Sequence, residues 1–322
     1  MSRLLDAVNW ILLTLGDAVQ WVWNDGLGYL GSGFALVGDA INPVFAPVFT
    51  WLNVVINAVA GVLLAPIGAM PGWLSNTIIS AVTGVGLLIL FKYTSNQQAI
   101  GRVKDDIKAN MLALKLFKDE LSVTFRSQGL VFLGALRLLR YAVWPLLVMI
   151  VPVSLELGQM GLWYQWRPLP PGEKSLITMK LAGDPKAAMP QVKVVSIPGA
   201  EVTIGPVRIR SKREVCWEIR ASEAGRHRIA FEVDSQRFEK EFVVRDRGFE
   251  RVSAVRPPRR WTAILLHPLE KPFAKDSPVQ SISIDYPPRS SRTSGTDWWL
   301  GYFFVTSIVF ALIFKPLIKV KI

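Results

Sequence analysis

The segment Trp73–Phe91, WLSNTIISAVTGVGLLILF, decides the fold class of this chain, because it is long and apolar enough to cross a bilayer as one helix. Two further segments qualify, Tyr141–Tyr164 (YAVWPLLVMIVPVSLELGQMGLWY) and Trp298–Phe314 (WWLGYFFVTSIVFALIF). Each of the three is bordered by Trp or Tyr, whose rings prefer the headgroup level. The sequence therefore predicts a multi-span α-helical membrane protein with a three-span core.

The composition is typical of a membrane protein and contains few residues that could bind a metal or act in catalysis. The 322 residues are 51% hydrophobic and 19% charged, whereas a soluble globular chain carries about 25% charge. One Cys and two His exclude a disulfide framework and a multi-Cys zinc site. No Gly-rich phosphate loop and no GxSxG elbow occur. We therefore expect neither an enzyme nor a cofactor or metal.

The N-terminal part before the first span is apolar but two-faced. Residues 45–64 are long enough to span, yet their polar side chains recur at helical spacing and form one stripe, which is typical of a helix lying in the interface. We expect residues 1–72 to form amphipathic interfacial helices, with 45–64 as an alternative fourth span. The stripe consists of Thr50, Asn53, Asn57 and Gly61.

Charge asymmetry sets the orientation. Residues 92–140 carry nine Lys or Arg against four Asp or Glu, and positive loops near spans stay in the cytoplasm. We expect a multi-pass protein of the bacterial inner membrane whose long segment between the second and third spans is external, or periplasmic. The predicted units are spans 73–92, 141–164 and 298–314, a cytoplasmic hairpin 93–140, an external domain 165–297 and a cytoplasmic tail 315–322.

The cytoplasmic segment is predicted to be a basic helical hairpin. Apolar residues recur there at intervals of three and four, as in an amphipathic helix, and Gly129 is expected to break that helix before the chain returns over 130–139. The hairpin is either a plain structural element or an arm that contacts a nascent chain or ribosome. Its apolar stripe, the candidate client-contact face, comprises Ile100, Val103, Ile107, Met111, Leu114 and Phe117.

The external segment is predicted to be an antiparallel β-sandwich of immunoglobulin type, because short β-branched and aromatic runs alternate with polar residues. Trp217 is expected to fill its core, and Cys216 to be either packed or a reactive thiol. His267 is placed at a strand end. The basic clusters 208–213 and 256–260 indicate a solvated strand face or contact with anionic membrane lipids, and no specific nucleic acid is expected.

The spans carry polar residues, and Glu156 stands out because an ionisable residue inside a span indicates a functional site. These residues either line a partly hydrated groove or act as packing contacts between helices, with Ser80 and Gly84 as a small-xxx-small pair. The candidate groove residues are Asn76, Thr77, Ser80, Thr83, Lys92, Ser154, Glu156, Gln159, Thr306 and Ser307.

The order of an outer amphipathic helix, a span, a basic hairpin and two more spans resembles the Oxa/YidC insertase superfamily. The likeness is to its minimal three-span members, the archaeal YidC-like proteins and the core subunit of the ER membrane protein complex. It is carried by residues 91–129 followed by WPLLVMIVPV at 144–153, and the external β domain would be an insertion. The resemblance implies a hydrated groove on the three spans and a mobile receiving arm around 100–128.

Two functional hypotheses follow. One is an insertase-like biogenesis factor whose groove accepts short polar segments of hydrophobic client proteins. The other is a non-catalytic, membrane-anchored scaffold that presents the immunoglobulin-like domain to an envelope protein partner. An enzyme with an external active site has little support from the few candidate acid–base and metal-ligating residues.

Overall fold

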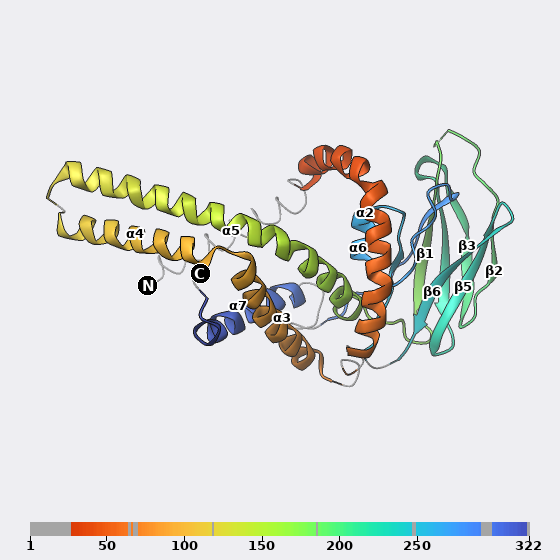
Figure 1. The fold of residues 1–322 in the computed structure, drawn as a ribbon. Helices are drawn as coiled ribbons and strands as arrows, with labels where there is room; N and C mark the ends of the chain where they lie inside the picture. Colours follow the sequence, from red (N-terminus) through yellow and green to blue (C-terminus); the bar gives the residue numbers. More distant parts are fainter. Residues whose placement is uncertain are drawn as a thin grey trace, which may run out of the picture.

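The computed structural model describes residues 27–63, 66, 70–117, 119–184, 186–246, 249–290 and 298–320, with side chains from residue 41 onward except 62 and 63. The part of the predicted interfacial helices that falls on residues 1–26 lies outside this description. Figure 1 shows three regions in a row: a long helical hairpin, a group of crossing helices, and a β region at the opposite end.

Four helices are long and apolar enough to cross a membrane, which confirms a chain of multi-pass type. One is the 41–61 part of α2, and the others are α3, α5 and α7. The bounds of the helices are α2 Leu27–Leu63, α3 Gly72–Thr94, α4 Gln97–Leu116, α5 Leu121–Tyr164, α6 Trp261–Leu266 and α7 Trp299–Ile318.

The hairpin consists of α4 and the first half of α5, and its turn lies earlier than the sequence predicted. Helix α4 ends at Leu116 and α5 begins at Leu121, and Gly129 lies inside α5, so the expected break there is wrong. A lone Gly costs a helix only about 1 kcal/mol, which the helical residues on both sides outweigh. Asn96 starts α4 by accepting a hydrogen bond from the Ala99 N–H. Helix α5 thus runs unbroken for 44 residues from hairpin to β region.

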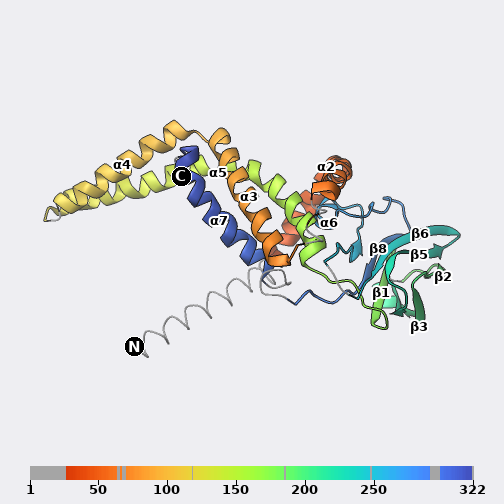
Figure 2. The ribbon, with the colours of Figure 1, turned by 90° about the horizontal axis from the view of Figure 1, so that it is seen from below.

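Helix α2 differs in direction from the other apolar helices. Figures 1 and 2 together show it running across the ends of α3 and α5, between these helices and the β region. Pro43 and Pro47 lie within it, and Figure 1 shows that it is bent, as expected where proline removes a backbone donor. Helix α3 contacts both α5 and α7.

The segment between α5 and α7 forms two antiparallel sheets. The first has the strand order β3-β4-β1-β8-β7 and the second β2-β5-β6. Trp217 is buried between them beside Phe231, with ring centroids 5.3 Å apart, as expected of a core residue. Cys216 is buried as well, which favours the packed alternative. The immunoglobulin type of sandwich stays a prediction. The strands are β1 Lys174–Leu181, β2 Val192–Ser196, β3 Ala200–Ile209, β4 Glu214–Ala221, β5 Gly225–Val233, β6 Gln236–Val244, β7 Val255–Arg256 and β8 Val279–Ile284.

The sequence did not predict the short helix α6, which leaves the β region and packs against α2 and α5. Its Ile264 lies in an apolar cluster with Ala46 and Phe49 of α2. His267, expected at a strand end, instead follows the last turn of α6, where its N–H donates to the Ala263 carbonyl. Helix α6 therefore joins the β region to the helical part.

Candidate functional site

Most of the predicted groove residues on α3 lie in its contact with α7. Asn76 and Ser80 are fully buried there, and the Ser80 hydroxyl donates to the Asn76 carbonyl at 2.6 Å. The Asn76 amide donates to the Trp299 carbonyl at 3.4 Å. Ser307 of α7 is also buried and lies against Gly84. Together with the Trp299 carbonyl, Asn76, Ser80, Gly84 and Ser307 make a close helix–helix contact of the kind that small residues permit.

Two more predicted residues tie α3 to α7 nearer the helix ends. The Thr77 and Tyr302 hydroxyls are 2.6 Å apart. At the other end, the Lys92 ammonium donates to the Ile318 carbonyl at 2.8 Å. A cation on the last carbonyls of a helix is favoured by the helix dipole. Lys92 therefore caps α7, a role that the sequence alone did not indicate.

Glu156 of α5 faces α3. Its carboxylate accepts a short hydrogen bond from the Thr83 hydroxyl. Glu156, Ser154 and Thr306 are partly buried, whereas Thr83 is buried. Thus the acid that stood out in the sequence joins α5 to the same face of α3 that carries the buried polar residues.

Two asparagines of the polar stripe of α2 bind protein, whereas Gly61 of the same stripe is exposed. The Asn53 amide donates to the Ile264 carbonyl at 2.8 Å, and the Asn57 amide donates to the Pro268 carbonyl at 2.7 Å. Gln159 of α5 is buried and donates to the Asn57 side chain at 2.8 Å. The structure therefore joins Gln159 to Asn57 of α2 rather than to the polar residues of the α3–α7 contact.

The predicted client-contact face of α4 is divided along its length. Ile100 and Val103, near the membrane helices, are buried against α5. At Gly134 of α5 an added Cβ would come 2.5 Å from the Ile107 side chain, so glycine allows a close approach. Leu114 is partly buried, whereas Met111 is 57% exposed and Phe117 is exposed as well.

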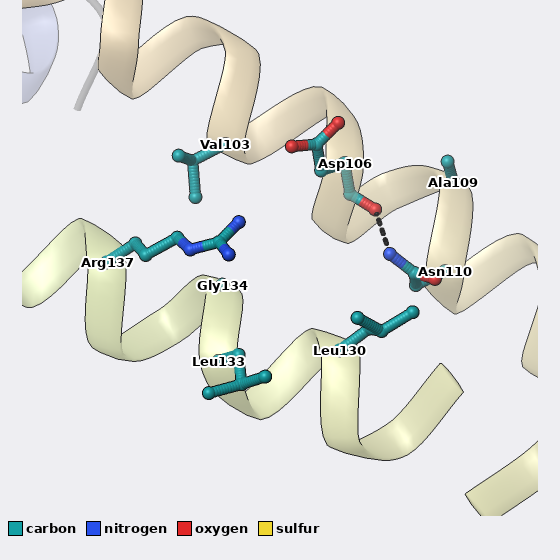
Figure 3. Close-up of a pocket in the computed structure, with 8 residues that line it drawn as sticks. All are labelled: Val103, Asp106, Ala109, Asn110, Leu130, Leu133, Gly134 and Arg137. Carbon is teal, nitrogen blue, oxygen red and sulfur yellow. Dashed lines mark hydrogen bonds between the residues drawn. The ribbon is translucent and has the colours of Figure 1, made fainter. Parts of the chain in front are cut away.

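The exposed apolar surface continues across the turn of the hairpin. We call it the tip surface; its members are Met111, Leu112, Leu116, Phe117, Leu121 and Phe125. Between the two helices lies a pocket of about 170 Å³. Figure 3 shows Arg137 of α5 reaching toward α4 in this pocket, while the Asn110 amide donates to the Asp106 carbonyl. The pocket lies beside the packed part of the hairpin, since Val103 and Gly134 both line it, and no residue of the tip surface does.

The β region contains a buried polar cluster that was not predicted from the sequence. Lys240 of β6 is 0% exposed, and its ammonium forms a short ion pair with Glu270 and donates to the Ser253 carbonyl at 2.7 Å. The other Glu270 oxygen accepts the Glu241 N–H at 3.1 Å. A signal existed, since Phe238, Lys240 and Phe242 alternate along one face of the strand, which places the lysine at an inward position.

This cluster fixes the segment that leads into and out of α6, because Ser253 precedes that helix and Glu270 follows it. Burial lowers the pKa of Lys240, whereas the neighbouring Glu270 carboxylate raises it. Burial likewise lowers the pKa of His267, an effect that Lys240 strengthens and Glu270 opposes. The arrangement is a structural ion pair of the type that is costly to break.

No family model, no curated protein and no solved structure matches this chain. Within the described residues, no three His, Cys, Asp or Glu side chains are grouped so that they could hold a metal ion. The candidate sites therefore remain the polar contacts of the apolar helices, the tip surface of the hairpin and the buried cluster around Lys240.

Proposed function

We propose that the protein is an insertase-like factor for membrane protein biogenesis, whose hydrophobic clients are received by the hairpin and whose polar segments enter between the apolar helices. The observation that carries this proposal is the tip surface. A long, basic hairpin that is continuous with an apolar helix exposes large apolar side chains at its far end, where α4 and α5 themselves do not cover them.

The tip surface is suited to bind a hydrophobic client segment before that segment enters the membrane. Phe125 is 71% exposed and Met111 is 57% exposed, and contiguous exposed apolar surface marks an interaction site. Flexible Met side chains can repack against many partners. The cations Lys115 and Arg126 beside this surface would attract the acidic surroundings of a ribosome or of anionic lipid.

The polar contacts of the apolar helices supply the second part of the proposal. A polar client segment crosses hydrocarbon more easily where protein offers hydrogen-bonding partners. Such partners lie on adjoining faces of α3 and α5, joined by the Thr83–Glu156 hydrogen bond. We propose that α3 and α5 separate at this contact and thereby expose a polar path, with Asn57 and Gln159 forming its outer end.

The proposed topology follows from the directions of the helices. If α3, α5 and α7 cross the bilayer, α2 lies in its plane on the β side, because α2 runs across their ends. Its polar stripe is used by α6 and α5, and its opposite apolar face, which includes Trp51 and Val55, is exposed. The positive hairpin is then cytoplasmic and the β region external.

The test is insertion of a small single-span client with a short translocated tail into proteoliposomes that contain the purified protein. Glu156→Gln keeps the size of the side chain and removes the charge, and Glu201→Gln, on exposed strand β3, is the matched control. We expect insertion to be slower for Glu156→Gln at equal protein content, and unchanged for the control. Equal rates for empty liposomes and proteoliposomes would overturn the proposal.

The scaffold function remains the second candidate, and one observation favours it. Strand β3 lies at the edge of the five-stranded sheet and exposes Val202, Ile204 and Val207. Exposed edges accept strands from partners. The test replaces these three residues by Lys in the full-length protein, crosslinks the membranes and measures the size of its complex on native gels. If β3 binds an envelope protein, the complex of the variant should be smaller. An unchanged complex size would remove this reason for the scaffold function.

A further inference from the structure

A pocket of about 570 Å³ lies between α2 and the segment that follows α6. One wall is mainly apolar and consists of Pro47, Thr50, Trp51 and Val54 of α2, with the Thr50 hydroxyl donating to the Ala46 carbonyl of its own helix. The opposite wall is residues 271–274, with Arg259 and Lys271 at its margin. The pocket thus has an apolar floor that continues into the exposed face of α2 and a positively charged rim.

The backbone that carries the two cations is held in place. The Arg259 carbonyl accepts a hydrogen bond from the Asn42 amide at 2.9 Å. The Lys271 carbonyl accepts from the Arg256 guanidinium at 3.1 Å, and that guanidinium also lies 4.3 Å from the centre of the Phe273 ring. The rim is therefore anchored to α2 on one side and to the β region on the other.

The charges themselves are not neutralised. Neither Arg259 nor Lys271 forms a salt bridge with any residue that the structure describes, and both are exposed. On the far side of Phe273, a second pocket of about 440 Å³ adds Lys180, Arg260 and Lys275 to the same positive region. Elsewhere in the β region, arginines such as Arg226 and Arg245 are paired with Glu250.

We infer that this pocket binds an anionic glycerophospholipid, with its phosphate between Arg259 and Lys271 and an acyl chain along Pro47, Trp51 and Val54. A negative headgroup joined to an apolar chain matches the two halves of the pocket, whereas a soluble anion would use the rim alone. The inference rests on the proposed in-plane position of α2, which puts the pocket at headgroup level, and it does not depend on insertase activity.

The positive charge of the rim indicates that the lipid headgroup is anionic. The apolar floor indicates where the acyl chain lies. Each basic residue near a membrane surface attracts anionic lipid appreciably, and aromatic side chains such as Trp51 favour the boundary between headgroups and acyl chains. A lipid in this position would join α2 to the segment that carries α6. It would therefore fasten the β region to the membrane beside the polar contacts of Asn53 and Asn57.

The test is native mass spectrometry of the full-length, delipidated protein in detergent, with phosphatidylglycerol or phosphatidylcholine of identical acyl chains as the probe. The variant Arg259→Gln/Lys271→Gln is compared with Arg208→Gln/Lys212→Gln, which removes two exposed charges on the same domain at another place. We expect phosphatidylglycerol to bind the unchanged protein and the control with the same affinity. Its affinity for the first variant should be lower by about tenfold. Equal binding to all three proteins would overturn the inference.

Two further measurements separate the sources of a phosphate. Glycerol 3-phosphate, the soluble headgroup fragment, should fail to displace phosphatidylglycerol at equal concentration; complete displacement would show a soluble-anion site and overturn the lipid assignment. Trp51→Gln should weaken phosphatidylglycerol binding, and unchanged binding would exclude the acyl position. Circular dichroism checks that each variant is folded. Because none of these measurements involves a client, their failure is distinguishable from failure of the insertase proposal.

Discussion

Gly84 of α3 and Ser307 of α7 touch through their backbones: a Cβ atom added to Gly84 would lie 2.2 Å from the Ser307 carbonyl oxygen. Only glycine fits such a contact without movement of one helix. The contact lies on the face of α3 that carries the buried Ser80 and Asn76. The association of α3 with α7 therefore depends on a missing side chain as well as on polar groups.

Replacing Gly84 by Ala should weaken this helix pair. The added methyl group forces α3 and α7 apart, and overpacking of this kind costs about 1–3 kcal/mol. Thermal unfolding in detergent measures the loss. Gly86→Ala is the matched control, because an added Cβ there meets nothing within 4 Å, and it should be neutral or slightly stabilising. Equal melting temperatures for the two variants would contradict the close contact.

Replacing Glu270 by Ala should destabilise the β region strongly. Lys240 would keep a fully buried charge without its carboxylate, which costs about 3–5 kcal/mol. The double variant Lys240→Met/Glu270→Leu removes both charges and should recover most of that loss. Urea unfolding followed by tryptophan fluorescence measures both. A single variant as stable as the unchanged protein would show that the pair is not buried in solution.

Stability should fall as the pH drops below about 6.5, the ordinary pKa of histidine. Because burial lowers the pKa of His267 in the folded protein, the unfolded chain binds more protons in this window, and stability rises with pH across it. Lys240 and Glu270 are the charged groups that influence His267. His267→Gln removes the titrating ring and should flatten this dependence. An identical slope of unfolding free energy against pH in the variant would refute the assignment.

Replacing Lys92 by Met should loosen the C-terminal end of α7. The ammonium of Lys92 donates to the Ile318 carbonyl, and a cation at a helix C-terminus contributes about 0.3–1 kcal/mol. Amide hydrogen exchange in the last turn of α7 should therefore become faster. Lys108→Met, on the exposed side of α4, is the control and should leave that exchange unchanged. Exchange that is equally slow in both variants would exclude the capping role.

Some features of this protein were predictable because they depend on neighbouring residues. The apolar lengths of α3 and α7, the helical hairpin and the antiparallel strands around Trp217 each follow from a local pattern of period or composition. The position of the hairpin turn was not predictable in this way. Gly129 is a plausible helix breaker by itself, yet α5 continues through it, because the cost of one glycine is small beside the helix formed by the residues on both sides.

The candidate site shows the same division. The sequence indicated that Asn57, Glu156 and Gln159 are unusual, because polar groups in apolar helices need partners. It did not indicate which partners they have, since these lie 73 to 211 residues away in the chain. The tertiary structure connects Glu156 to α3, and Gln159 to α2.

The sequence by itself determined that this chain has several helices long and apolar enough to cross a membrane, a basic hairpin and a β-rich segment, because hydrophobic length and alternation are properties of consecutive residues. Only the tertiary structure decided that α6 packs against α2, that Lys240 is buried with Glu270, and that α3 contacts α7 at Gly84. The reason is physical: a helix or strand has several faces, and packing against distant elements chooses which of them is covered.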